Sequence, residues 1–266
     1  MVLDASADGA GLDPHIEPGG GRDTPRTLKD TILLIMSLKT QYHHLRRRVY
    51  YLIADLGLYR YNLDVYNHNF FLGNRRDGEK HAQWFVDLLI RTFGCTSLAD
   101  VGCGTGHFLK TAKDRGLRIF GIEGAKEALG DLLMVDKSCV CQHDLRDPIA
   151  FSEPKYDLCI SVEVAEHIDR RYSDNFIKIL TDLSDTVALT AAHPNQGGAA
   201  HVNEQPQEWW IDRFAKFGYE ISPGKVKELR NGMEEAKAKG FFVDFYLIPN
   251  IMVFENKRRT LEQSAR

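Results

Sequence analysis

Three glycines with the spacing G-x-G-x-G, Gly102, Gly104 and Gly106, lie between an apolar run and a segment of helical pattern. Glycine lets the backbone turn sharply and approach a ligand closely, and the helix that follows directs its N-terminus at that ligand. Glu123 follows 19 residues after Gly104, at the end of the next apolar run. A carboxylate there can accept hydrogen bonds from both hydroxyls of a ribose, so the pattern predicts a nucleoside-containing ligand.

A dinucleotide is the obvious alternative ligand for such a loop. Its fingerprint is G-x-G-x-x-G, however, and here the third glycine comes one residue early. Asp100 also lies inside the turn, where it would repel a pyrophosphate. An acidic residue at this position suits a ligand with an ammonium group, such as S-adenosylmethionine.

Two further polar clusters follow later strands. The first is E-x-x-E-H, formed by Glu163, Glu166 and His167, and the second is a polar run that includes His193 and His201. Because ligands of open α/β sheets bind outside the carboxyl ends of the strands, we expect both clusters beside one pocket. A histidine can remove a proton near neutral pH. His201 is therefore the first candidate base and His193 the second, with His167 and Glu166 orienting or assisting.

Alternating strand and helix patterns surround these residues, which predicts an α/β fold with a mostly parallel sheet and helices on both faces. The predicted strands are 97–102, 118–123, 138–145, 156–164 and 186–192, with a terminal strand or hairpin within 241–256. The predicted helices are 78–94, 107–116, 125–134, 172–183 and 207–217. Asn250, isolated among apolar residues, is expected to have a specific hydrogen-bond partner.

Composition divides the chain into four parts. Residues 1–26 are rich in Gly, Asp and Pro and are predicted to form a disordered tail. Apolar residues at helical spacing predict an N-terminal helical extension over 27–77, which could close over the pocket or join two copies in a homo-oligomer. The α/β domain is expected over 78–256, and residues 257–266 form a frayed C-terminal tail.

The overall composition excludes several classes of protein. A net charge of −3 over 266 residues gives no general signal of nucleic-acid binding. No apolar run approaches the ~18–20 residues of a membrane span, and the N-terminus lacks the pattern of a signal peptide. The five cysteines have neither the spacing of a disulfide framework nor that of a zinc site. We therefore expect reduced cysteines and a cytoplasmic location.

Four segments in order carry a family resemblance: "DVGCGTG", "GIE", "HDL" and "YDLCISVEVAEHI". Over residues 98–168 the chain resembles the class I S-adenosylmethionine-dependent methyltransferases. The resemblance implies a Rossmann-like seven-stranded sheet with a reversed last strand, and S-adenosyl-L-methionine as the cofactor.

The same resemblance implies roles for individual residues. The methionine part of the cofactor would lie at the glycine loop, the ribose at Glu123, and the adenine at Asp144 and Leu145. Residues after the fourth strand would line the sulfonium region. The complete cofactor-binding set implied is Asp100, Gly102, Cys103, Gly104, Glu123, Gly124, Asp144, Leu145, Val162 and Glu163.

The E-x-x-E-H cluster could instead hold a divalent metal. With His201 it would offer two carboxylates and two imidazoles, which suit Mg²⁺ or a transition metal that lowers the pKa of an acceptor hydroxyl. This arrangement is similar to the metal site of small-RNA 3′-terminal 2′-O-methyltransferases and of ubiquinone-pathway O-methyltransferases, although the downstream histidine lies closer here. The alternative is structural: Glu166 caps a helix and His167 packs beneath the cofactor.

A narrower resemblance rests on "YNHNFF", "SVEVAEHI", "GGAAHVNEQPQEWW" and "YLIPNIMVF". These segments look like those of a methyltransferase subgroup often encoded beside glycosyltransferases and polysaccharide genes. We therefore expect O-methylation of a polar small molecule, with a sugar or glycan favoured. The alternatives are an RNA ribose 2′-O-methyltransferase, to which the arginines at 46–48 could contribute, and a non-catalytic partner subunit that keeps the fold.

Overall fold

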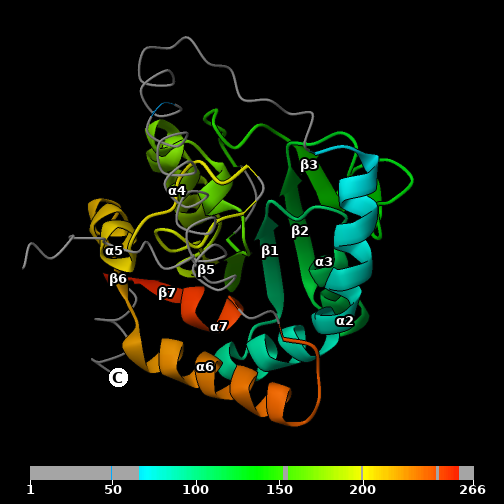
Figure 1. The fold of residues 1–266 in the computed structure, drawn as a ribbon. Coiled ribbons are helices and arrows are strands. Elements are labelled where there is room, and N and C mark those ends of the chain that lie inside the picture. The colour runs from blue at the N-terminus through cyan, green and yellow to red at the C-terminus, as the bar shows by residue number, and fades with distance from the viewer. Residues whose placement is uncertain (1–48, 50–65, 152–154, 199, 244–245, 258–266) are drawn as a thin grey trace, which may run out of the picture. The chain divides into compact units, whose positions relative to one another are not determined.

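The computed structural model describes residue 49 and residues 66–257, apart from 152–154, 199 and 244–245 (Figure 1). The predicted tail at 1–26, the arginines at 46–48 and most of the predicted extension at 27–77 lie outside the described residues, as do residues 258–266 of the C-terminal tail. The described residues belong to one compact unit, Val49–Arg266. Within them, no helix combines the length and apolar character that a bilayer span requires.

Seven strands form one sheet in the order β3-β2-β1-β4-β5-β7-β6. Neighbouring strands from β3 to β5 pair in parallel, whereas β7 is antiparallel to both β5 and β6. This order confirms the predicted Rossmann-like sheet with its reversed last strand. The strands are β1 Ser97–Val101, β2 Arg118–Glu123, β3 Val140–Gln142, β4 Leu158–Ser161, β5 Thr186–Thr190, β6 Tyr219–Ile221 and β7 Ile251–Asn256.

The strand order places a topological switch point beside β1. The chain moves from β1 to β2 on one side and later returns to β4 on the other, so Asp100 of β1 pairs with Gly121 and with Ile160. Ligands of open α/β sheets bind at such a point, outside the carboxyl ends of the strands. The glycine loop and the residues that follow β2, β3 and β4 therefore meet at one edge.

Helices cover both faces of the sheet (Figure 1). One core lies between the sheet and α2, α3 and α6, and contains Leu98 of β1. The second lies between the sheet and α4 and α5, and contains Ala99 and Val101 of the same strand. This alternation along β1 is the two-residue period of a strand buried on both faces. The helices are α2 His68–Phe93, α3 His107–Asp114, α4 Ser173–Leu183, α5 Gln207–Lys216, α6 Pro223–Ala238 and α7 Leu247–Asn250.

The helix α2 is longer than the predicted helix at 78–94. It begins after Asn67, whose side chain accepts a hydrogen bond from the backbone N–H of Phe70 at 3.1 Å. It ends at Gly94, which has the left-handed conformation typical of a helix C-terminus. The domain boundary predicted at residue 78 therefore falls inside a continuous helix.

The helix predicted at 125–134 is wrong. The segment forms turns, and the N–H of Met134 donates to the carbonyl of Thr105 at 2.9 Å instead of to a helical partner. Gly130 weakens a helix at its centre. The apolar residues Ala128 and Leu132 pack against Phe71 of α2, so tertiary contacts take the place of the helix.

The elements β6, α6 and α7 were not predicted from the sequence. β6 is only three residues long, and α6 carries few large apolar residues, although its buried positions Val226, Leu229 and Met233 have helical spacing. The helix packs closely on α2, because a Cβ added at Gly232 would lie 2.3 Å from Cδ1 of Leu88. The two helices thus share the core on one face of the sheet.

Candidate functional site

A cavity of about 510 Å³ opens at the carboxyl ends of β1 to β4. Every residue of the predicted cofactor-binding set lines it: Asp100, Gly102, Cys103, Gly104, Glu123, Gly124, Asp144, Leu145, Val162 and Glu163. Of the predicted catalytic residues, His167 lines the cavity and the others do not. The structure thus brings the sequence motifs together around one space.

The glycine loop forms the floor of the cavity. Gly102 has a φ of 79°, and a Cβ there would lie 2.5 Å from Cγ2 of Val164, so no larger residue fits. The N–H groups of Gly102 and Cys103 donate to the carbonyl of Ile122 at 2.8 and 3.0 Å. These bonds tie the loop after β1 to the end of β2.

The carboxylate of Glu123 contacts this loop. Its two oxygens accept hydrogen bonds from the N–H groups of Gly104 and Ala125, each at 2.8 Å. Burial raises the pKa of Glu123, and these backbone donors counteract part of that rise. The side chain is therefore fixed at the position where the sequence predicts a ribose contact.

Asp100 is a buried carboxyl without a full set of partners. It is 2% exposed, and its Oδ2 atom has no hydrogen-bond partner among the described residues. Burial, together with the charge of Glu123, raises the pKa of Asp100 to about 8. A cavity with adjacent carboxyls of this kind favours a ligand that brings positive charge.

Asp144 follows β3 in the chain and also lines the cavity. Its carboxylate accepts hydrogen bonds from Nε of Arg146 at 2.8 and 3.1 Å, and this pairing lowers the pKa of Asp144. Arg146 also lines the cavity. A ligand amino group at Asp144 would therefore share the carboxylate with a guanidinium.

The first turns of α2, with Tyr66 just before them, form a wall of the cavity that sequence reasoning missed. Tyr66 and Phe70 meet edge to face with centroids 5.2 Å apart, and Tyr66 also meets the ring of His167 edge to face at 5.8 Å. The aromatic run in "YNHNFF" was the available signal. The residues of this wall are Tyr66, Phe70, Phe71, Asn74, Gly78 and His81.

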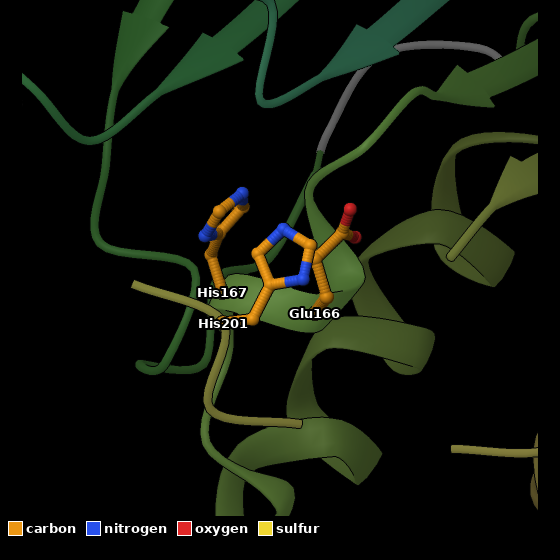
Figure 2. Close-up of side chains that lie close together, drawn as sticks. All are labelled: Glu166, His167 and His201. Atoms are coloured by element: carbon orange, nitrogen blue, oxygen red, sulfur yellow. The ribbon is translucent and has the colours of Figure 1, made fainter. Parts of the chain in front are cut away.

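A second cluster combines Glu166, His167 and His201. Each offers one ligand atom, and these atoms lie within 4.8 Å of one another. Figure 2 shows the two imidazole rings and the carboxylate extending to the same side of the short 3₁₀ helix η3, Ala165–His167. The structure thus places His201 of the second polar cluster beside Glu166 and His167 of the first.

Backbone hydrogen bonds bring His201 to this position. The N–H groups of Val202 and Asn203 both donate to the carbonyl of Glu166, at 2.9 and 3.0 Å. The buried amide of Asn203 also donates to the hydroxyl of Ser173 at 3.2 Å. The loop after β5 is therefore fastened onto η3.

Glu204 holds the imidazole of His201, and sequence reasoning missed this residue. Its carboxylate accepts the N–H groups of Asn195 and Gly197, each at 2.8 Å, and lies 3.0 Å from Nδ1 of His201. An acceptor at Nδ1 fixes the proton there and leaves Nε2 to act as a base or ligand. Gly198 makes room for the ring, since a Cβ there would lie 2.2 Å from Nε2.

Glu166 of this cluster has a second acid, Glu163, as its neighbour. Glu166 is fully buried, and neither oxygen makes a well-formed hydrogen bond within the described residues, although Glu163 and the N–H of Ala192 lie near. Burial, and next the charge of Glu163, raise the pKa of Glu166 well above its usual range. Glu163 has a φ of 54°, a strained conformation that costs about 1–3 kcal/mol.

Asn250 stabilises the arrangement of Glu163. Its Nδ2 atom donates to Oε1 of Glu163 and to Oε1 of Gln196, each at 3.1 Å. The N–H of Glu163 donates to the hydroxyl of Thr190 at 2.7 Å. The specific partner predicted for Asn250 is therefore confirmed, although the residue ends α7 and does not lie within a strand.

The other two histidines predicted for the site, His167 and His193, differ in their surroundings. Nδ1 of His167 lies 3.3 Å from the carbonyl of Ala200, and burial, with a further contribution from His201, lowers the pKa of His167 to about 4. His193 lies outside the cavity, and its Nε2 bonds the carbonyl of Pro249 at 3.2 Å. The structure does not bring His193 into the cluster.

Comparisons with known proteins agree with the motifs. Residues 99–182 match the family model described as "Methyltransferase domain". Uncharacterized methyltransferases from Mycobacterium avium (strain 104) and Mycolicibacterium paratuberculosis (strain ATCC BAA-968 / K-10) are each 32% identical over 77 residues. The matched segment is 28% of this chain and spans 30% of the length of either relative.

Solved structures with a similar fold include two methyltransferases. One is an amino pentose methyltransferase from Micromonospora echinaspora, solved with S-adenosylmethionine, with a TM-score of 0.49 and 14% identity over 68% of this chain and 92% of its own. The other is the magnesium protoporphyrin IX methyltransferase from Synechocystis PCC 6803, solved with S-adenosylhomocysteine. Its TM-score is 0.43, with 17% identity over 57% of this chain and 75% of its own.

The raised pKa of Asp100 predicts a pH-dependent effect of Asp100→Asn on stability. Because the folded pKa of about 8 exceeds the unfolded value, Asp100 stabilises the fold at low pH, and this contribution disappears as the pH rises through 8. Asn stays neutral, so the melting temperature of the variant relative to wild type should increase by a few degrees between pH 5 and pH 8. The exposed Asp212→Asn is the control. A difference that does not change with pH would contradict the assignment.

The family assignment rests on the strand order with its reversed β7, the glycine loop beneath Glu123, and the match over residues 99–182. The chain contains a methyltransferase domain.

Proposed function

We propose that the protein transfers the methyl group of S-adenosylmethionine to a hydroxyl of a polar acceptor, with a sugar or glycan favoured. The observation that carries this proposal is the His201 imidazole, held at Nδ1 by Glu204 at 3.0 Å, beside His167 at the edge of the cavity. An oriented histidine is the group that a hydroxyl acceptor needs for loss of its proton.

The charges of the cavity support S-adenosylmethionine as the methyl donor. In the proposal, Asp100 with Gly102, Cys103 and Gly104 contacts the methionine part, and Glu123 with Gly124 contacts the ribose. The adenine lies at Asp144 and Leu145, and Val162 and Glu163 line the sulfonium region. The carboxyl groups along this path complement the ammonium and sulfonium charges of the ligand.

The reaction is an in-line displacement at the methyl carbon. The acceptor oxygen forms a bond to this carbon as the carbon–sulfur bond breaks, and the electron pair stays on sulfur, which becomes neutral. The acceptor proton moves to Nε2 of His201. The protein contributes alignment and a cavity that excludes water, together with this base.

The aromatic wall favours a ring-shaped acceptor. Tyr66 lies next to His167, and Phe70 lies next to Tyr66, so an acceptor at the cluster would contact an aromatic surface. Sugars present apolar ring faces and polar edges, which match aromatic rings beside imidazoles. This wall also leads us to propose that residues 66–77, the last part of the predicted 27–77 extension, contribute to the acceptor site of the 78–256 domain.

We predict that His201→Gln lowers the methyl-transfer rate by about 10²–10³-fold, because general-base catalysis contributes on this order. Binding of S-adenosylhomocysteine should not change. The measurement is transfer of labelled methyl from S-adenosylmethionine to a panel of saccharides and to RNA. His193→Gln is the matched control and should keep the wild-type rate, since His193 lies outside the Glu166, His167 and His201 cluster and its Nε2 bonds the carbonyl of Pro249. A wild-type rate in His201→Gln would contradict the proposed base.

A metal-assisted RNA ribose 2′-O-methyltransferase is the second candidate function. The donor set fits a divalent metal, because the buried oxygens of Glu166 lack well-formed hydrogen bonds and Nε2 of His167 and of His201 remain available. A bound metal would lower the pKa of the acceptor hydroxyl. Glu204 would then orient His201 as a metal ligand, whereas in the first candidate it orients His201 as a base.

For this second candidate, we predict that chelator-treated protein binds one Mn²⁺ and that Glu166→Gln and His201→Gln both lose it. Calorimetric titration with MnCl₂ measures this directly, and labelled transfer to RNA with 2′-hydroxyl ends tests the acceptor. Wild-type protein that binds no Mn²⁺ would rule out this candidate and leave the histidine base.

A further inference from the structure

The side chain of His107 is a buried polar group for which the methyl-transfer chemistry has no use. It lines the cavity, is 8% exposed, and its Nδ1 atom has no hydrogen-bond partner among the described residues. The edge of the ring that carries Nδ1 packs on α2, because a Cβ added at Gly78 would lie 2.6 Å from Nδ1 and Cε1. The nitrogen left to meet a ligand is Nε2.

His107 is also the first residue of α3, and the start of this helix is open. The N-cap is Gly106, which makes no side-chain cap, and the first turn contains no acidic residue. The first intrahelical bond runs from the N–H of Lys110 to the carbonyl of Gly106. The N–H groups of His107, Phe108 and Leu109 therefore have no acceptor within the helix, and together with the helix dipole they favour an anion.

The neighbouring groups set the protonation of His107. Burial, followed by the effect of His81, lowers the pKa of His107 to about 3. The ring is therefore neutral, and with no acceptor facing Nδ1 its proton belongs on Nε2. A neutral N–H beside an open helix start is a donor group for a carboxylate.

The other charged residues of the cavity wall indicate which groups the ligand carries besides a carboxylate. Asp100 and Glu123 favour the cationic parts of a ligand, and the cationic Arg146 is engaged with Asp144, which follows β3 at the far side of β2 from β1. A ligand that carries an ammonium and a carboxylate on one carbon would meet both kinds of group at the loop between β1 and α3.

We infer that His107, with the open N-terminus of α3, binds the α-carboxylate of the cofactor's amino acid portion and so selects cofactors that carry this group. This inference rests on the proposed function, in which the methionine part lies at the glycine loop. His107 then determines which sulfonium compounds the protein accepts, and Gly78 is required to make room for its ring.

The test compares S-adenosylhomocysteine with its decarboxylated analogue, in which hydrogen replaces the carboxylate. Calorimetric binding of both is measured for wild type, His107→Phe and the control His193→Phe. His107→Phe keeps a ring against Phe108, whose centroid lies 4.2 Å away, but removes the donor. We expect about a tenfold or greater loss of affinity for S-adenosylhomocysteine, with little change for the analogue, because a hydrogen bond to a charged group is lost.

Gly78→Ala provides a second route if His107→Phe does not fold. Alanine suits the α2 helix, but its Cβ would occupy the space of the His107 ring and displace it. The same selective loss is expected. Equal losses for both ligands, or no loss, in the folded variants would overturn the inference while leaving the proposed function intact. Wild-type protein that binds neither ligand would overturn both.

Discussion

The hydrogen bond from the N–H of Gly104 to the carboxylate of Glu123 connects the two halves of the cofactor region. It joins the loop after β1 to the end of β2, where the carbonyl of Ile122 already accepts two N–H groups of the same loop. The three glycines of this loop have left-handed conformations, and at Gly102 an added Cβ would also lie 2.5 Å from Cγ2 of Val164. The loop held in this way connects β1, which carries Asp100, to α3, and it lines the cavity.

The acidic groups of the site lie closer together than stability alone would favour. Asp100, Glu123 and Glu166 all have raised pKa values, chiefly because burial disfavours their charged forms. Glu163 adds a strained backbone to the same edge of the sheet. Functional sites commonly retain such unfavourable features because a ligand relieves them. A cationic ligand is the kind that would do so here.

The sequence was most informative where structure is local. The glycine loop was predictable because the conformations that Gly102, Gly104 and Gly106 adopt are properties of glycine itself. The strand order followed from family motifs and from the alternation of strands and helices. The helix predicted at 125–134 failed because long-range contacts with Phe71 and Thr105 decide its conformation.

The sequence analysis did not identify site residues whose role depends on contacts that no sequence motif indicates. Glu204 gave no sign of its role, because its contact with His201 depends on the fold of a whole loop. The α2 wall was missed because only the packing of α2 on α3 and α6 places its first turns beside the cavity.

The central claim is that the glycine loop and Glu123 bind S-adenosylmethionine, and calorimetric binding of its product S-adenosylhomocysteine tests this claim most directly. Wild type would be compared with Glu123→Gln, which keeps an acceptor oxygen for the Gly104 N–H but removes the charge, and with Glu127→Gln, which lies outside the cavity. The account predicts binding by wild type and Glu127→Gln, and an affinity reduced about tenfold or more in Glu123→Gln. Well-folded wild-type protein that does not bind the product would contradict the account and would instead fit a subunit that keeps the fold without catalysis.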